Sequence, residues 1–98
     1  MIRVELPTHL RNLAGVSGPV RVEVTGPATL VSVLEALEEA HPVLRGTMRP
    51  HDGEGRRPLL RFYAGRRDLS HEPFHHPLPA EVVSGGEPLL VVGAIAGG

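Results

Sequence analysis

The residues best suited to chemistry lie at the C-terminal end, which reads Ala94-Ile95-Ala96-Gly97-Gly98. All of them except Ile95 are small, and glycine has no Cβ, so two glycines make a narrow and pliable tail. Such a tail can enter a tunnel that larger residues would block. A carboxylate is a poor electrophile until a good leaving group is attached to it. The pattern therefore indicates a reactive carboxylate at Gly98 that is presented to the active site of another protein.

A second pattern with chemical potential is a histidine-rich stretch. Residues 71–75 read His-Glu-Pro-Phe-His and match the zinc-protease motif, in which both histidines lie on one helix face. Pro73 stands between His71 and His75, and proline is tolerated only in the first turn of a helix. We therefore predict an exposed loop and no catalytic zinc site. Adventitious metal binding by His71, His75 and His76 stays open.

Other patterns that carry catalysis are incomplete in this sequence. Thr8-His9 places a hydroxyl beside an imidazole, but neighbours along the chain do not make a catalytic triad. Gly53-Glu54-Gly55 neither follows a strand nor opens a helix, so it does not form a phosphate-binding loop. The absence of cysteine excludes disulfides, thiol catalysis and thiolate metal sites. These observations give only weak support for catalysis by the side chains of this protein.

The composition is that of a small globular protein. Its 98 residues, of which 41% are hydrophobic, fit one domain with one modest core. The net charge is −1, whereas a nucleic-acid-binding surface needs a clustered basic excess. The N-terminal residues have no long apolar core, and no stretch approaches the length of a membrane span. We therefore expect a cytoplasmic protein that is a monomer when free and binds neither nucleic acid nor membranes.

Two strands open the predicted fold. Residues 2–6 and 20–25 alternate apolar and polar side chains, which is the pattern of a half-buried strand. Gly15 and Pro19 are turn formers, and they predict a long loop over residues 10–19 that joins the two strands as a hairpin.

One amphipathic helix follows these strands. Thr29 is a suitable N-cap, and apolar residues then recur at positions i, i+3, i+4 and i+7. Pro42 is expected to end the helix. A helix face of this kind is more often core than binding site, so we assign it to the core. The residues of the apolar stripe are Leu30, Val33, Leu34 and Leu37.

The second half of the chain supplies the remaining strands. Residues 49–58 predict a surface loop, residues 59–64 a strand and residues 66–69 a short return strand. Prolines leave residues 70–79 irregular. Residues 89–92 form the last strand, which leads directly into the C-terminal tail. The predicted fold class is α+β, with a mixed sheet of four to five strands packed on one main helix.

Three stretches carry a resemblance to a known family. They are residues 10–15 (Leu-Arg-Asn-Leu-Ala-Gly), the turn over residues 85–87 (Gly-Gly-Glu) and the ending over residues 94–98. Together with the order of the elements, they resemble the ThiS/MoaD family of ubiquitin-like sulfur carriers, over essentially the whole chain. Residues 37–63 are most similar to the carriers that serve cysteine synthesis in actinobacteria, and the Ile-Ala-Gly-Gly ending also resembles the thiamine-pathway carrier. Where family members commonly have Asn-Gly, this chain has Ala-Gly at residues 64–65.

The resemblance implies a ubiquitin-like β-grasp domain over residues 1–93 and a flexible tail over residues 94–98. In such carriers a ubiquitin-activating-type enzyme uses ATP to adenylate the C-terminal carboxylate, which here belongs to Gly98. Sulfur from a donor then replaces AMP, and the resulting thiocarboxylate passes its sulfur to an acceptor held by a biosynthetic enzyme. The acceptor is of the cysteine, molybdopterin, thiamine or tRNA-thiolation type. ATP and the sulfur donor are used by the partner enzymes, and the carrier itself binds no cofactor.

The residues expected to contact these partners are Ile95, Ala96 and Gly97 of the tail and two residues of the last strand. If the alternate side chains of that strand face the helix, Leu90 and Val92 face outward on the bare side of the sheet. An exposed apolar patch beside the tail would serve as a docking site.

Two other functions stay open at this point. A ubiquitin-like protein modifier would use the same activated tail to join lysines of target proteins. A β-grasp interaction module that takes no part in chemistry would carry the Gly-Gly ending incidentally.

Overall fold

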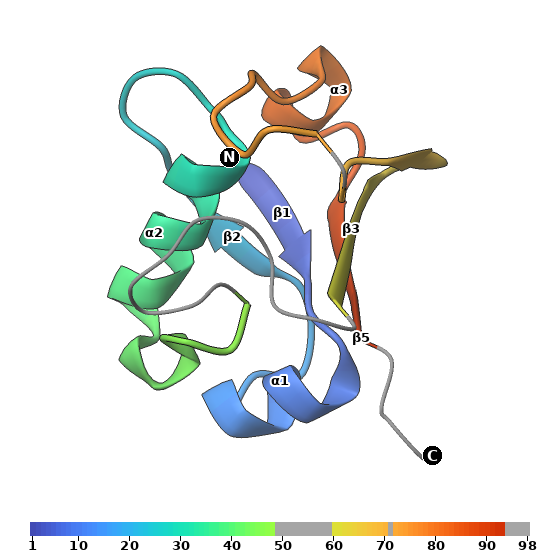
Figure 1. Cartoon of the computed structure of the whole chain (residues 1–98). Helices are drawn as coiled ribbons and strands as arrows, with labels where there is room; N and C mark the ends of the chain where they lie inside the picture. The colour runs from blue at the N-terminus through green and yellow to red at the C-terminus, as the bar shows by residue number, and fades with distance from the viewer. Residues whose placement is uncertain (49–59, 71, 94–98) are drawn as a thin grey trace.

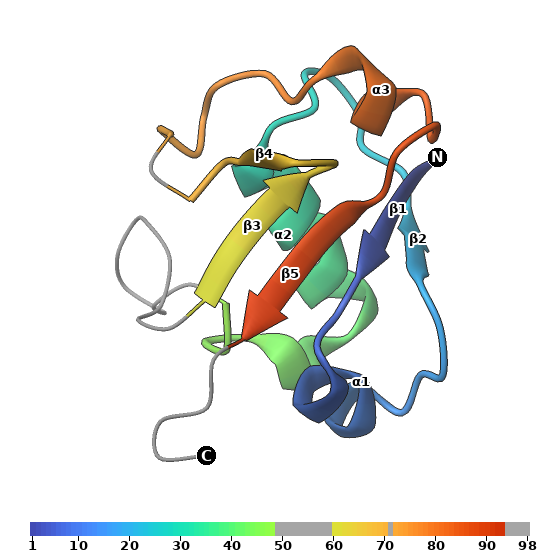
Figure 2. The same ribbon diagram turned by 90° about the vertical axis from the view of Figure 1, so that its right-hand side faces the viewer.

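The structure of the chain is a computed structural model that describes residues 1–48, 60–70 and 72–93 (Figure 1). The predicted surface loop, the first histidine of the protease-like motif and the predicted C-terminal tail lie outside these described residues. The described part is a five-stranded mixed sheet with its main helix packed on one face (Figure 2). This arrangement confirms the predicted α+β fold class.

The sheet places the last strand at its centre. The strands are β1 (Ile2–Glu5), β2 (Val20–Val22), β3 (Leu60–Ala64), β4 (Arg67–Asp68) and β5 (Leu89–Gly93). Their order across the sheet is β2-β1-β5-β3-β4. Strand β5 runs parallel to β1 and antiparallel to β3, with Val4 opposite Leu89 and Phe62 opposite Val91. The strand that leads to the C-terminal tail is therefore held from both sides.

The main helix α2 (Leu30–Ala40) has the predicted start, apolar face and end. The Thr29 hydroxyl oxygen accepts a hydrogen bond from the Ser32 backbone N–H at 3.1 Å, and the Ser32 hydroxyl oxygen accepts one from the Thr29 N–H at 2.8 Å. These reciprocal bonds form a capping box, which satisfies two donors that the first helical turn would otherwise leave unpaired. All four residues of the predicted stripe are buried. The helix ends before the short 3₁₀ helix η1 (Pro42–Leu44), as Pro42 predicted.

The predicted loop between the first two strands was wrong, because this region contains helix α1 (Thr8–Ala14). Pro7 is the N-cap, and its carbonyl oxygen accepts hydrogen bonds from the backbone N–H groups of Leu10 and Arg11. Gly15 ends the helix with φ of 72°, a left-handed conformation that glycine adopts without strain. Only Leu10 of the helix is buried, so the periodic apolar signal of a longer helix is missing.

Smaller departures concern the ends of elements. Strand β2 stops at Val22, earlier than predicted, and β5 continues to Gly93. A single-turn helix, α3 (Ala80–Val83), was not predicted; it follows Pro79 and buries Val82 completely. A four-residue helix cannot display a helical repeat, which explains why the sequence pattern did not reveal it. Among the described residues from 70 to 79 there is no helix or strand longer than a single bridge, in agreement with the prediction.

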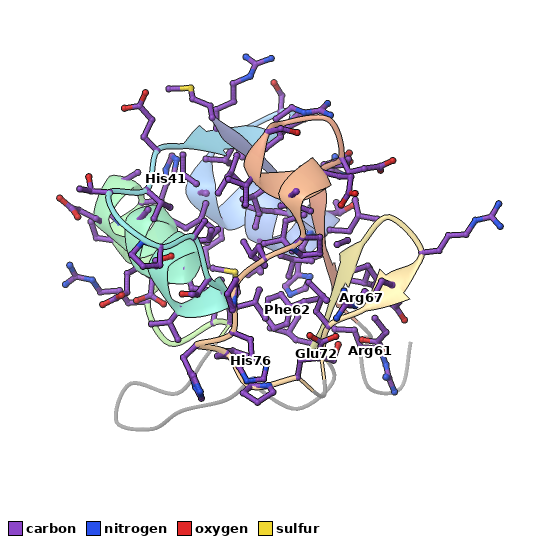
Figure 3. The ribbon with its side chains drawn as sticks, turned by 90° about the horizontal axis from the view of Figure 1, so that it is seen from above. His41, Arg61, Phe62, Arg67, Glu72 and His76 are labelled. Carbon is purple, nitrogen blue, oxygen red and sulfur yellow. The ribbon has the colours of Figure 1, made fainter. Side chains whose placement is uncertain are left out.

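The core lies between the sheet and α2, and Phe62 of β3 is its largest fully buried side chain (Figure 3). Its ring meets that of Phe74 edge to face, with 5.5 Å between the ring centroids. The buried Ser70 hydroxyl accepts a hydrogen bond from the Phe62 backbone N–H at 2.8 Å, so the irregular segment after β4 is tied to the sheet. Across residues 1–48, 60–70 and 72–93, no helix is long and apolar enough to cross a membrane.

Candidate functional site

The described structure ends at the C-terminal end of β5, where the candidate reactive tail begins. β5 lies between β1 and β3 in the sheet, and its last residue, Gly93, pairs with Leu60 of β3 (Figure 2). The ladder on the β1 side joins Val4 to Leu89 and Glu5 to Leu90. The position from which residues 94–98 leave the domain is therefore set by a central strand of the sheet rather than by a loop.

Gly93 lies against helix α1 at this exit point. A Cβ atom on Gly93 would lie 2.8 Å from the His9 Cε1 atom, 3.4 Å from a Leu60 methyl carbon and 3.6 Å from the Pro7 ring. The first of these distances is shorter than carbon atoms tolerate, so a side chain at residue 93 would require the exposed His9 ring to shift. Sequence reasoning missed this contact. It treated His9 only as a neighbour of Thr8, whereas the fold of α1 brings its exposed ring to the root of the tail.

The face of the sheet that points away from α2 carries an apolar centre beside this exit. Leu89 and Val91 are buried, whereas Leu90 is half-buried and Val92 is 45% exposed, so the predicted orientation of the last strand is confirmed. Tyr63, also half-buried, lies opposite Leu90 in the ladder between β3 and β5. We call Tyr63, Leu90 and Val92 together the docking face.

Charged side chains surround the docking face. Glu5 lies opposite Leu90 on one side, and Arg61 lies opposite Val92 on the other. The Arg61 guanidinium is 3.5 Å from an oxygen of Asp68, whose other oxygen accepts a hydrogen bond from the Ser70 backbone N–H at 2.8 Å (Figure 3). An exposed ion pair of this length contributes little stability. An apolar centre with a polar rim is the usual anatomy of a protein–protein interface.

The sequence and the fold were compared with known proteins. No family model and no curated protein matches the sequence. Small archaeal modifier protein 1 of Haloferax volcanii superposes with a TM-score of 0.74 at 27% identity, over 98% of this chain and 97% of that one. CysO of Amycolatopsis orientalis, solved in complex with BexX, covers 100% of both chains at 21% identity with a TM-score of 0.74. CysO of Mycobacterium tuberculosis covers 97% of this chain and 100% of its own at 18% identity, with a TM-score of 0.72.

The chain has the ubiquitin-like β-grasp fold, and the solved structures that it matches are carriers and modifiers of the ThiS/MoaD type. This confirms the family resemblance that the sequence suggested. The matched proteins are small carriers or modifiers rather than catalysts.

The histidine motif takes no part in this β-grasp site. Residues 72–76 form bends and turns rather than a helix, so the helical geometry of the zinc-protease motif is not formed there. The rings of His75 and His76 pack edge to face with centroids 5.1 Å apart. Glu72 is engaged by the Arg67 guanidinium, with N···O distances of 3.0 and 2.8 Å (Figure 3). Within the described residues, no group of three or more histidine or acidic side chains is placed to hold a metal ion.

The contact between Gly93 and His9 leads to a prediction about stability. Gly93→Ala is expected to destabilise the protein by about 1 kcal/mol, because the new methyl group must displace the His9 ring. In a His9→Ala background the same change is expected to be neutral or stabilising, since replacing glycine lowers the entropy of the unfolded chain. Urea unfolding of the four forms gives the coupling energy of the double-mutant cycle. Equal effects of Gly93→Ala in both backgrounds would contradict the contact.

Proposed function

We propose that this protein is a sulfur carrier whose reactive group is the carboxylate of Gly98. A ubiquitin-activating-type enzyme joins a carboxylate oxygen of Gly98 to the α-phosphorus of ATP and releases pyrophosphate. A sulfur nucleophile from a donor then attacks the acyl carbon and displaces AMP, which leaves a thiocarboxylate. One observation carries the proposal: the central strand of a ThiS/MoaD-type β-grasp fold leads directly into a sequence that ends in Gly-Gly.

The geometry of the exit suits this role. Five residues follow Gly93 in the sequence, and an extended chain of that length reaches at most about 17 Å. The carboxylate of Gly98 can therefore enter a partner's active site while the folded domain, residues 1–93, stays on the partner's surface. Ile95, Ala96 and Gly97 would line the entry, and only Ile95 has a side chain larger than a methyl group.

The docking face is the proposed contact with partner enzymes. Its side chains lie on β3 and on β5, and β5 is the strand that leads to the tail. A partner that covers Leu90 and Val92 is therefore positioned to receive Gly98. A CysO protein of the same fold has been solved in complex with BexX, which supports an assembly with a partner protein. We propose two such partners, the adenylating enzyme and a biosynthetic enzyme that accepts the sulfur for a product of the cysteine, molybdopterin or thiamine type.

A protein modifier that uses the same tail is the second candidate function. The observation that favours it is the 27% identity to small archaeal modifier protein 1. Both functions need an activated Gly98 carboxylate, and they differ in the nucleophile that takes the acyl group. A sulfur atom gives carriage, whereas a lysine amine of a target protein gives conjugation.

An intact-mass experiment tests these functions. The chain is incubated with its cognate adenylating enzyme, ATP and a sulfur donor, and the mass of the protein is recorded. Exchange of one oxygen for sulfur at Gly98 is the result expected of a carrier. Attachment to other proteins indicates a modifier. An unchanged mass with a partner that is known to bind the chain overturns both proposals and indicates an interaction module.

The docking face gives a second prediction. Val92→Asp is expected to weaken binding to the adenylating enzyme by about tenfold to thirtyfold, since it places a charge in the apolar centre of the contact. The matched control is Val83→Asp on α3, because Val83 is 42% exposed and Val92 is 45% exposed. Both variants are expected to fold normally, and calorimetric titration measures their affinities. If the two bind equally well, the contact with the enzyme lies elsewhere.

A further inference from the structure

Strand β2 forms one edge of the sheet, and its outer side has no neighbouring strand in the described part of the chain (Figure 2). Alternate residues of an edge strand direct their N–H and C=O groups away from the sheet, and these groups can pair with another chain. Natural proteins protect such edges with very short strands, charged side chains or proline. β2 is short and carries Arg21, and Pro19 directly precedes it, but residues 20–24 themselves contain no proline. The main-chain groups of residues 20–24 can therefore pair with a strand whose charges complement those of this edge.

The sequence of this edge is complementary to itself. It reads Val20-Arg21-Val22-Glu23-Val24. When two copies are aligned antiparallel about Val22, the arginine of each copy lies opposite the glutamate of the other, and valines lie opposite valines. Each pair joins two even-numbered or two odd-numbered residues. Because the residues that direct their main-chain N–H and C=O groups outward alternate along each strand, these groups of the two copies lie opposite one another.

Burial along the edge agrees with such pairing. Val20 and Val22 are buried and Val24 is half-buried, whereas Arg21 and Glu23 are exposed. The alternation thus continues past the end of β2, so residues 23 and 24 keep the period of a strand. In the self-paired arrangement the three valines of both copies lie on the side of α2, and the charges lie on the other side.

The electrostatics of the sheet also favour a carboxylate from a second copy. Arg21 lies directly opposite Arg3 in the ladder between β1 and β2. Like charges at opposed positions are unfavourable. The Arg3 guanidinium donates to the carbonyl oxygens of Gly85 and Gly86 at 3.2 and 3.4 Å, so it is held in place. The ion pairs between described residues include neither Arg21 nor Glu23. Glu23 of a second copy would lie opposite Arg21 and offset the repulsion between Arg21 and Arg3.

An open groove of about 420 Å³ lies between β2 and α2. Ala36 and Ala40 are one helical turn apart on its helix wall, and their side chains are small. The remaining lining residues are Arg21, Val22, Glu23 and Glu39.

From these observations we infer that β2 is a self-association edge, which pairs antiparallel with β2 of a second copy about a two-fold axis at Val22. The pairing joins two five-stranded sheets into one. It goes beyond the proposed function and departs from the expectation of a monomer when free. β1 separates β2 from β5, so the docking face stays free in the dimer. Sulfur carriage and self-association are therefore independent properties.

Charge reversal at the edge tests this inference. Arg21→Glu and Glu23→Arg each place like charges opposite one another, twice in the symmetric dimer, and each is expected to weaken self-association by about tenfold. The double variant Arg21→Glu/Glu23→Arg restores opposite charges and is expected to associate within about threefold of the original chain. Arg66→Glu, an exposed change in the turn between β3 and β4, alters the net charge as Arg21→Glu does and controls for that change. Sedimentation equilibrium over a range of protein concentrations at low ionic strength measures all five forms.

The outcomes are distinct. Loss of association in both single variants and recovery in the double variant support the pairing. A chain that stays monomeric in its original form overturns the inference and leaves the edge to an extended segment of a partner protein. Association that is unaffected by the single variants also overturns it, because the contact then lies elsewhere. The intact-mass experiment reports on the proposed function separately, so failure of one proposal is not failure of the other.

Discussion

Addition of one alanine after Gly98 is expected to lower thiocarboxylate formation by at least about 100-fold, because the reacting carboxylate is displaced by the length of a residue. The added residue lies beyond residues 1–93, so the thermal midpoint of unfolding is expected to stay the same. The measurements are intact mass after incubation with the adenylating enzyme, ATP and a sulfur donor, and calorimetry of the free chain. Together they separate loss of chemistry from loss of fold.

The control for this prediction is an alanine added before Met1. It lengthens the chain equally but leaves the Gly98 carboxylate available, and it is expected to leave the conversion unchanged. If the chain extended at Gly98 acquires sulfur as readily as the original, Gly98 is not the reactive residue. The proposed function would then have to be withdrawn.

Phe62→Ala is expected to destabilise the domain by about 3–5 kcal/mol, the range for removing a fully buried aromatic side chain. Phe62 has no exposed surface, and its ring contacts that of Phe74. A small domain has only about 5–15 kcal/mol of stability, so the variant would lose a large share of it. Because Phe62 pairs with Val91 of β5, the same change is expected to loosen the root of the tail. Urea unfolding measures the first effect, and amide hydrogen exchange of β5 measures the second.

Tyr63→Ala provides the matched comparison, since Tyr63 is the next residue of the same strand and points to the opposite face of the sheet. It is half-buried, so its loss is expected to cost about 1–2 kcal/mol, and its main effect falls on partner binding. If the two variants unfolded at the same urea concentration, Phe62 would not be the centre of the core.

Local patterns in the sequence predicted the helices and strands that are long enough to show their characteristic repeat of apolar residues. The stripe on α2 was visible because four buried residues repeat at helical spacing, and Thr29 marked the start of the helix. Alternation predicted the first two strands, and one of the two possible orientations of the last strand pointed Val92 outward, as the structure shows. Tyr63 was predicted to lie in a strand but was assigned to neither face, and one strand alone does not show which strand will lie beside it. Tyr63 was therefore missed as a member of the docking face.

Other features depend on contacts between distant parts of the chain. α1 has a single buried residue, Leu10, and a helix that short is held by its packing rather than by its own periodicity. The approach of His9 to Gly93 follows from that packing, and it joins residues from opposite ends of the sequence. The self-complementary stretch around Val22 acquires meaning only once β2 is known to be an edge of the sheet.

The sequence by itself therefore determined the α+β class, the main helix and the Gly-Gly ending that directs attention to Gly98, because each is encoded in neighbouring residues. Only the tertiary structure decided that β5 lies at the centre of the sheet, that Tyr63 joins Leu90 and Val92, and that the His9 ring lies against Gly93. These features depend on which strands pair and on what packs over their ends. Strand pairing and packing depend on the free energy of the whole fold, so the sequence of a single segment does not reveal them.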